Sequence, residues 1–301
     1  MSNINVYQIV TDKIIAGLKQ GNIPWDKPWK GGGSAKNFIS KKPYTGINAF
    51  LLSIDLAENG YKQPYYLTFK QAKEKGGTVK EGSKSQLIVY WNWIIKNTGE
   101  FDKDGKALTR KFPILKYYRV FNIEQVNGLK YDAIVEDKPI DPIAECEKIL
   151  ENCTVKPEIR NNELRAYYSP AKDYINVPKK EFFKTSEGFY CTLFHELVHS
   201  TGHASRLNRT GVAEFDTFGS HKYSQEELIA EIGSVFLCTI SGIDKQVEDN
   251  SQAYINSWIK ALENDPKMII YASAKAQKAV DYIQGINQTV KAETEPVAIT
   301  V

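Results

Sequence analysis

The hydrophobic pattern of the first 130 residues predicts a mixed unit of helices and strands. Apolar positions at close to helical spacing predict helices at residues 4–20 and 69–75. Residues 37–52 are expected to form a turn that leads into a buried helix ending near Gly60. Thr68 is placed to cap the helix at 69–75. Short apolar and aromatic runs predict strands at residues 65–68, 86–93 and 115–122. The polar, Gly- and Asp-rich segment 97–111 is expected to be a surface loop.

The pattern changes at residues 131–142, which are acidic and interrupted by proline, and we predict a linker there. Asp141 and Pro142 are suited to cap and begin a helix over residues 143–150. Further elements are expected as strands at 154–158, 165–169 and 174–177, and as helices at 224–240, 251–262 and 268–283. The predicted fold class is therefore α+β in two domains, residues 1–130 and 143–290, with a disordered tail at 291–301.

The overall composition is that of an ordinary globular protein, with 42% hydrophobic and 25% charged residues. No apolar run approaches the roughly 20 residues that span a bilayer, and the N-terminus lacks the features of a signal peptide. We therefore expect a cytoplasmic protein that does not engage a membrane. The four cysteines form no Cys-x-x-Cys pair, a distribution that favours reduced thiols.

The net charge of +3 conceals opposite charges on the two halves of the chain. Residues 1–130 hold 21 Lys and Arg against 10 Asp and Glu, a balance of +11, whereas residues 131–301 hold 18 against 26, a balance of −8. The basic half indicates contact with a polyanion. The alternative is that its lysine-rich surface only keeps the protein soluble.

Aromatic residues are interleaved with the excess of lysine in the basic half. Trp25 and Trp29 stand among Pro, Lys and Gly, and Trp91 and Trp93 fall in a predicted strand. Bases of a single strand can stack on such rings while lysines meet phosphates, so this half suits single-stranded nucleic acid better than duplex. The alternative is that these aromatic residues simply belong to the core of the domain.

The strongest chemical motif is His195-Glu196-Leu-Val-His199, in a stretch whose apolar residues predict a buried helix. Positions i and i+4 share one face of a helix, so His195 and His199 can present two imidazoles to one metal ion. Glu196 lies about 100° around the helix, where its carboxylate can act as a general base. Such spacing occurs by chance in other helices, but this chain has only four His, all between positions 195 and 221.

A catalytic zinc usually takes a third protein ligand, and a carboxylate on a second helix is the better candidate. His203 would lie about 12 Å along the axis from His195 if the helix continued, too far to share the ion. Glu227 and Glu231 lie at i and i+4, and the gluzincin pattern assigns Glu227 to the metal and Glu231 to a ligand histidine. Both could also be surface charges on an amphipathic helix. Glu226 is expected to be a solvated acid of the first helical turn.

This ligand set predicts one Zn²⁺, with another divalent ion as the alternative, and metal-assisted hydrolysis with Glu196 as general base. A donor beside the ligands would stabilise the oxyanion, and Tyr223, His221 and His203 are candidates among which the residues do not decide.

Longer motifs in both halves resemble the antirestriction protein ArdC family over nearly the whole chain. In the first half they are Pro24-Trp25-x-Lys27-Pro28-Trp29, Lys42-Pro-Tyr44-x-Gly46-Ile-Asn48, Leu67-Thr-Phe-Lys70-Gln-Ala-Lys73, Gly82-x-Lys84, Val89-Tyr-Trp91 and Val120-Phe-Asn122. In the second half they are His195-Glu-Leu-Val-His199-Ser-Thr-Gly-His203-x-Ser-Arg206-Leu-Asn-Arg209 and Glu226-Glu227-Leu-x-Ala-Glu231.

The resemblance implies a single-stranded DNA-binding domain joined to a zincin-like metallopeptidase domain, with a role in protecting incoming DNA from restriction during conjugative transfer. Our leading hypothesis is that the peptidase domain is directed at proteins on that DNA. Candidate DNA contacts are Trp25, Lys27, Trp29, Tyr44, Asn48, Lys70, Lys73, Lys80 and Lys84. Two other hypotheses stay open: a cytosolic zinc protease that does not bind DNA, and a non-catalytic DNA-protecting protein whose zinc is structural.

Overall fold

The computed structural model describes residues 5–21, 23, 35–101, 103, 105, 107–131, 141–213, 221–243 and 252–286. The predictions for Trp25, Lys27, Trp29, most of the linker and the tail at 291–301 lie outside this part of the chain. Within the described ranges, no helix is both long enough and apolar enough to cross a membrane.

The N-terminal half is built around a sheet with strand order β1-β2-β5-β4, in which only β1 and β2 are parallel. Its elements, in chain order, are α1 (Val6–Lys19), β1 (Lys36–Asn37), α2 (Gly46–Asn59), β2 (Tyr65–Thr68), α3 (Phe69–Glu74), β3 (Thr78–Val79), β4 (Gln86–Phe101), β5 (Ala107–Asn122), a 3₁₀ turn η1 (Ile123–Gln125) and β6 (Val126–Asn127). The predicted helices and strands are present, and Thr68 caps α3 through a hydrogen bond from the Gln71 backbone N–H.

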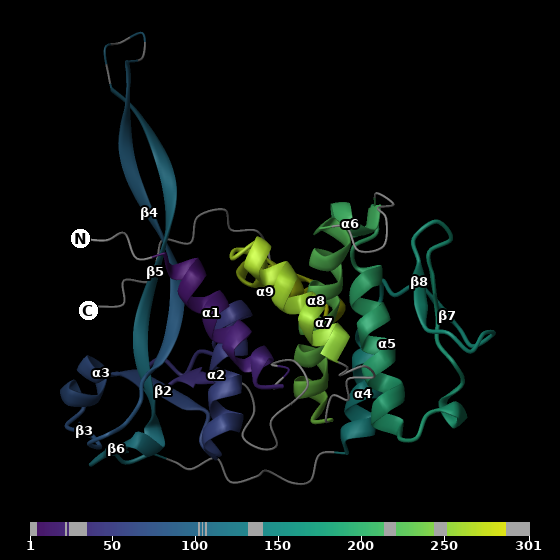
Figure 1. The fold of residues 1–301 in the computed structure, drawn as a ribbon, viewed down its shortest axis with the longest axis horizontal. Coiled ribbons are helices and arrows are strands. Elements are labelled where there is room, and N and C mark those ends of the chain that lie inside the picture. The colour runs from purple at the N-terminus through teal and green to yellow at the C-terminus, as the bar shows by residue number, and fades with distance from the viewer. Residues whose placement is uncertain are drawn as a thin grey trace.

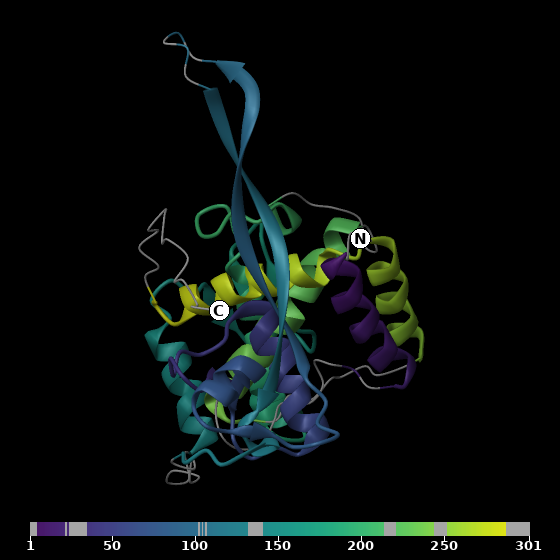
Figure 2. The same cartoon turned by 90° about the vertical axis from the view of Figure 1, so that its left-hand side faces the viewer.

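Strands β4 and β5 form a long two-stranded arm that extends beyond the rest of the molecule (Figures 1 and 2). The prediction of a surface loop at 97–111 is wrong, because the strands run to Phe101 and resume at Ala107. Backbone pairing between the two strands holds this ribbon, as in the facing residues Lys96 and Arg110, so it needs no apolar core beneath it. Its polar composition therefore gave no strand signal.

Helix α2 covers β4, the strand at the edge of this sheet. The Asn48 side chain donates from Nδ2 to the Val89 carbonyl (2.6 Å) and accepts from the Val89 N–H at Oδ1 (2.7 Å). Gln86 adds a hydrogen bond from its side chain to the Leu51 carbonyl of α2 (3.2 Å). The two Asn48 contacts occupy backbone groups at the sheet edge that would otherwise be open to another strand.

The C-terminal half is largely helical, with a three-stranded sheet at its margin (Figure 1). Its elements are α4 (Pro142–Asn152), β7 (Glu158–Arg160), β8 (Tyr167–Ser169), β9 (Tyr174–Asn176), a 3₁₀ turn η2 (Lys180–Phe182), α5 (Ser186–Ser200), α6 (Thr210–Ala213), α7 (His221–Ser241), α8 (Gln252–Asn264) and α9 (Met268–Ile283). Asp141 caps α4 and Pro142 begins it, as predicted. The strand expected at 154–158 instead begins at Glu158, after Pro157, which has no N–H to pair. All four cysteines are buried as thiols.

One hydrophobic core joins the two halves, so the chain folds as α+β with its domains in close contact. Helix α1 packs on α8 and α2 packs on α9. The core cluster accordingly includes Ile14 and Phe50 from the first half together with Leu197 and Ile269 from the second. The domain boundaries stay a prediction, because this shared core does not mark where one domain ends.

Replacing Asn48 by Ala should destabilise the protein, because it removes two hydrogen bonds and leaves the Val89 N–H and carbonyl without their partner. The free energy of unfolding should fall by about 2 kcal/mol, measured by urea denaturation. Asn59→Ala is the matched control, since Asn59 lies on the same helix and hydrogen bonds only within it, to Asp55. Equal effects of the two substitutions would contradict a structural role for Asn48.

Candidate metal centre

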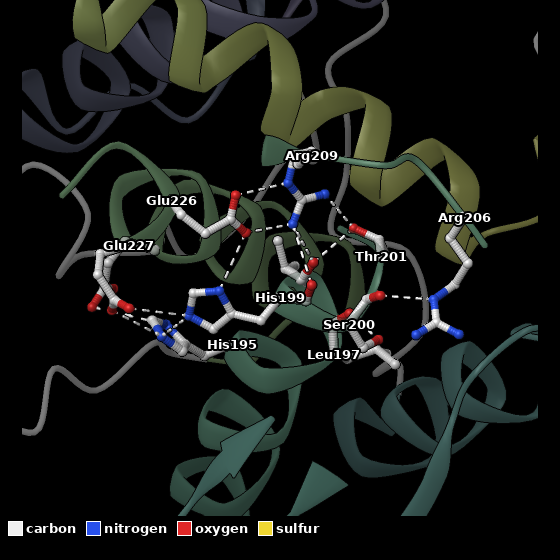
Figure 3. Close-up of polar contacts among 11 residues, drawn as sticks. His195, Leu197, His199, Ser200, Thr201, Arg206, Arg209, Glu226 and Glu227 are labelled. Atoms are coloured by element: carbon white, nitrogen blue, oxygen red, sulfur yellow. Dashed lines mark hydrogen bonds and ion pairs between the residues drawn. The ribbon is translucent and has the colours of Figure 1, made fainter. Parts of the chain in front are cut away.

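Helix α5 carries the two motif histidines on the face that it turns toward α7 (Figure 3). Thr185 caps its N-terminus by accepting a hydrogen bond from the Gly188 N–H (3.0 Å). Leu193, Leu197 and Val198 are buried, which anchors the helix and leaves the histidines at the edge of the core.

Glycine 233 allows α5 and α7 to approach closely. A Cβ atom at Gly233 would lie 2.8 Å from Cγ2 of Val198, a distance at which one of the helices would have to shift. The close contact places the acids in the first turns of α7 opposite the histidines of α5.

His195, His199 and Glu227 converge on one point, with one donor atom of each within 4.8 Å of the others. The two Nε2 atoms are 3.1 Å apart, and the Glu227 carboxylate oxygens lie 3.6 Å from His195 Nε2 and 3.5 Å from His199 Nε2. Ligands at 2.0–2.2 Å from a tetrahedral zinc are separated by about 3.3–3.6 Å. The three side chains therefore fit a single divalent ion, although their roles as ligands stay a prediction.

The second ring nitrogen of each histidine faces a carboxylate of α7. Glu231 Oε1 lies 3.9 Å from His195 Nδ1, consistent with the role expected for Glu231. Glu226 Oε1 lies 3.3 Å from His199 Nδ1. Carboxylates in this position fix the orientation of metal-binding imidazoles and increase their basicity.

The expectation that Glu226 is a solvated acid is wrong. Only 5% of its surface is exposed, and Arg209 donates to both of its carboxylate oxygens, with Nε 2.9 Å from Oε2 and Nη2 2.6 Å from Oε1 (Figure 3). Burial alone would raise the pKa of Glu226, but hydrogen bonds from Arg209 and His199 lower it below its usual value. Glu226 is therefore a buried carboxylate that connects a guanidinium to a histidine.

Arg209 is the functional residue that reasoning from helical spacing missed. Its guanidinium is buried and also donates to the Thr201 hydroxyl (2.6 Å) and the Val198 carbonyl (2.8 Å) at the end of α5. Gly202 makes this possible, since a Cβ there would lie 2.6 Å from Val212 and 3.0 Å from the guanidinium. Arg209 follows the helix in an irregular segment, where no periodicity marks it; only the family-like motif contains it.

A second arginine ties the end of α5 to the small sheet. Arg206 Nε donates to the Ser200 carbonyl (2.7 Å), and its guanidinium forms an ion pair with Asp173 in the turn between β8 and β9. The pKa of Asp173 is lowered, chiefly by this hydrogen bond.

The electrostatics of the site favour a bound cation. Burial by itself lowers the pKa of the His199 imidazole, but the carboxylates of Glu227, Glu226 and Glu196 outweigh burial and raise that pKa to about 9. The ring thus sits in a strongly negative field, which a divalent ion would neutralise. Glu196 is 8% exposed and contributes to this field.

The three candidates for the oxyanion donor are His203, Tyr223 and His221. His203 contacts the Ser205 hydroxyl through Nδ1 (2.8 Å) and does not belong to the converging group of His195, His199 and Glu227. The side chains of Tyr223 and His221 lie outside the described part of the structure.

The described DNA-contact candidates are spread over the N-terminal half. Lys70, Lys73 and Lys84 are exposed, and Tyr44 is partly buried. Lys80 donates to the Glu124 carbonyl (2.7 Å), and both polar side-chain atoms of Asn48 are engaged by Val89. The structure therefore presents Lys70, Lys73 and Lys84 to a ligand more openly than Asn48.

Family models match both halves of the chain. Residues 4–121 match the N-terminal domain of anti-restriction factor ArdC, and residues 144–275 match the zincin-like metallopeptidase model. Both matches agree with the predicted order of the two domains.

Solved structures of the antirestriction ArdC protein from plasmid R388 are similar to this chain throughout. The metal-free structure is 37% identical with a TM-score of 0.74, and the match covers 93% of this chain and 97% of that one. The Mn(II)-bound structure is 36% identical with a TM-score of 0.74, covering 96% of this chain and 100% of that one.

Curated relatives include two proteins named DNA primase TraC from Escherichia coli, which are 35% and 33% identical over 94% of this chain. The chain spans only 27% and 20% of their lengths. The protein y4eC of Sinorhizobium fredii is 29% identical, with 93% of this chain and 91% of that protein covered.

Replacing Arg209 by Met should destabilise the protein by about 3–5 kcal/mol, because it leaves the buried Glu226 carboxylate without its counter-charge. Metal affinity should also fall, by about 10–100-fold, because Glu226 would no longer be held against His199. Urea denaturation and isothermal titration with Zn²⁺ measure the two effects.

Arg165→Met, at an exposed position, is the control and should change neither quantity. The double variant Arg209→Met with Glu226→Gln should recover part of the lost stability. An Arg209→Met protein as stable as wild type would contradict this reading of the ion pair.

Proposed function

Because the chain belongs to the ArdC family, we propose that it is an antirestriction-type protein of a mobile element. In this proposal the N-terminal half binds single-stranded DNA, and the C-terminal half is a metal-dependent peptidase directed at proteins on that DNA.

The convergence of His195, His199 and Glu227 is the observation that carries the peptidase half of the proposal. A divalent ion held there would supply Lewis acidity for hydrolysis of a carbonyl compound. We infer Zn²⁺ from the two imidazoles and one carboxylate, while the Mn(II)-bound relative supports a divalent ion more generally.

Glu196 follows His195 on the same helix, and the proposal assigns it the transfer of a proton from the attacking water to the leaving group. The three converging side chains retain exposures of 19%, 13% and 27%, so they are accessible to solvent. We propose a peptide backbone as the substrate class, because residues 144–275 match the zincin-like metallopeptidase model.

The basic charge of the first half supports the DNA-binding part of the proposal. Residues 1–130 carry a balance of +11, from 21 Lys and Arg against 10 Asp and Glu. Two of the relatives are named DNA primases, which associates this sequence type with DNA. Phosphate contacts by exposed lysines would make such binding strongly dependent on salt.

A purely structural role of the metal is the alternative hypothesis. The Arg209–Glu226 pair that contacts His199 suits either role, because such carboxylates orient the histidine ligands of metal sites in general. Substitution of Glu196 separates the two possibilities, because a structural ion does not need a general base.

Replacing Glu196 by Gln should reduce peptidase activity by at least about 100-fold, because the amide cannot accept the proton. Metal content and single-stranded DNA affinity should stay within about twofold of wild type. Activity is measured as cleavage of fluorescent casein with and without a single-stranded oligonucleotide. DNA binding is followed by fluorescence anisotropy at about 50 mM and about 200 mM salt, across which affinity should fall steeply.

Glu187→Gln, a substitution of the same kind in the first turn of the same helix, is the control. Loss of metal from Glu196→Gln would assign Glu196 a structural role instead. If wild type cleaves protein but fails to bind DNA at low salt, the chain is a protease whose basic half serves another partner.

A further inference from the structure

A pocket of about 690 Å³ opens in the N-terminal half, beside α3 and the sheet and away from the metal centre. Figure 1 shows α3 and β2 on one side of the molecule and α5 on the other. The volume falls in the range of sites that hold small organic molecules. No step proposed for the metal centre uses this pocket.

Three parts of the chain form its walls. The segment between Asn37 and Tyr44 forms one wall and α3 the second. The third is one face of the sheet, where Ile88 faces Tyr118 across the β4–β5 pair and Val120 faces Thr68 of β2. The pocket is therefore built on backbone that hydrogen bonds fix in register.

The lining combines aromatic surface with cations. Tyr44 and Tyr118 both line the pocket, and Tyr118 is stacked on Tyr90 with ring centroids 4.8 Å apart and an angle of 18° between the planes. Lys42, Lys70 and Lys75 are exposed on its rim, against a single acid, Glu74, whose carboxylate is 4.0 Å from the Lys70 ammonium. A ligand with a planar aromatic group and an anionic group matches this surface.

The same face of the ribbon continues from the pocket along the arm. Side chains of paired strands alternate between faces, so the pairs Ile88–Tyr118, Tyr90–Lys116 and Lys96–Arg110 lie on one face. Lys116, Arg110 and Lys96 are exposed, and the Arg110 guanidinium lies 5.8 Å from the Phe112 ring. This face of the arm therefore carries exposed cations together with aromatic rings.

The opposite face of the arm's base is largely covered. Leu87, Val89 and Leu115 are buried there in the core that joins the two halves, although Trp91 on the same face is 40% exposed. The pocket face presents tyrosine rings and ammonium groups to solvent from the body of the protein toward the arm.

We propose that this pocket binds an unstacked base of single-stranded DNA, and that the flanking strand follows the pocket face along the arm. The inference rests on the proposed DNA-binding function and adds where on the N-terminal half the strand binds. The base stacks on the tyrosine surface while Lys42 and Lys70 neutralise phosphates on either side. Duplex DNA is excluded because its bases are already stacked and paired.

Tyr118→Leu tests the pocket directly, because it removes the stacking surface and keeps an apolar side chain. It should weaken binding of a single-stranded oligonucleotide about tenfold at fixed low salt. With an oligonucleotide carrying 2-aminopurine, wild type should quench the fluorophore and the variant should not. Tyr118→Phe retains the ring and should behave as wild type, whereas Tyr271→Leu, at an exposed aromatic position on α9, is the matched control.

The double substitution Lys42→Ala with Lys70→Ala tests whether the lysines on the rim of the pocket bind phosphates. Both residues are exposed, so the variant should remain folded. Two lost phosphate contacts should reduce the slope of log affinity against log salt by about 1.4. Lys260→Ala with Lys278→Ala removes two exposed lysines from α8 and α9 and should leave the slope unchanged.

The outcomes separate this inference from the proposed function. If wild type binds no single-stranded DNA at low salt, the proposed function fails and the pocket assignment fails with it. If wild type binds DNA while Tyr118→Leu retains full affinity and quenching, or the rim variant keeps the wild-type salt slope, the pocket assignment alone is overturned.

Discussion

The close contact between α5 and α7 is the constraint on which the candidate metal centre depends. A β-branched residue, Val198, packs directly against Gly233, and this approach brings the imidazoles of one helix within reach of the carboxylates of the other. Neither helix holds a metal-binding set by itself, because α5 offers two nitrogen donors and α7 offers the oxygen donor. The site exists because the two helices are packed in one register, which the buried Arg209–Glu226 pair reinforces from the far side of His199.

Sequence spacing predicted the part of the site that follows helical periodicity. His195 and His199 at i and i+4 share a face, and Glu227 with Glu231 repeats that spacing on the second helix. The burial of Glu226 was not predicted, because Glu226 and Glu227 are consecutive residues about 100° apart around the axis of α7. Which of the two is buried depends on where the neighbouring helix packs. Arg209 was missed because it reaches Glu226 from an irregular segment, whose path depends on the space left by Gly202.

The fold could be predicted where burial gives the sequence a regular spacing of apolar residues. It could not be predicted where backbone hydrogen bonds between strands hold an element without a core. The long helices of the C-terminal half were predicted from their apolar positions, and the cap at Asp141 was predicted from the Asp-Pro pair that begins α4. The outer arm was not, because its strands satisfy each other's hydrogen bonds without a core and its sequence is polar. The packing of α1 on α8 and of α2 on α9 could not be predicted either, because an amphipathic pattern shows which face of a helix is buried but not which helix packs against it.

The most direct test of the account is the metal content of the intact chain and of four single variants after equilibration with Zn²⁺ or Mn²⁺. Wild type and His203→Ala should each retain about one ion per chain, while His195→Ala, His199→Ala and Glu227→Ala should lose it, because each removes one of three converging donors. Circular dichroism establishes that the variants are folded. Retention of the ion by folded Glu227→Ala, or its loss from folded His203→Ala, would contradict the metal centre described here.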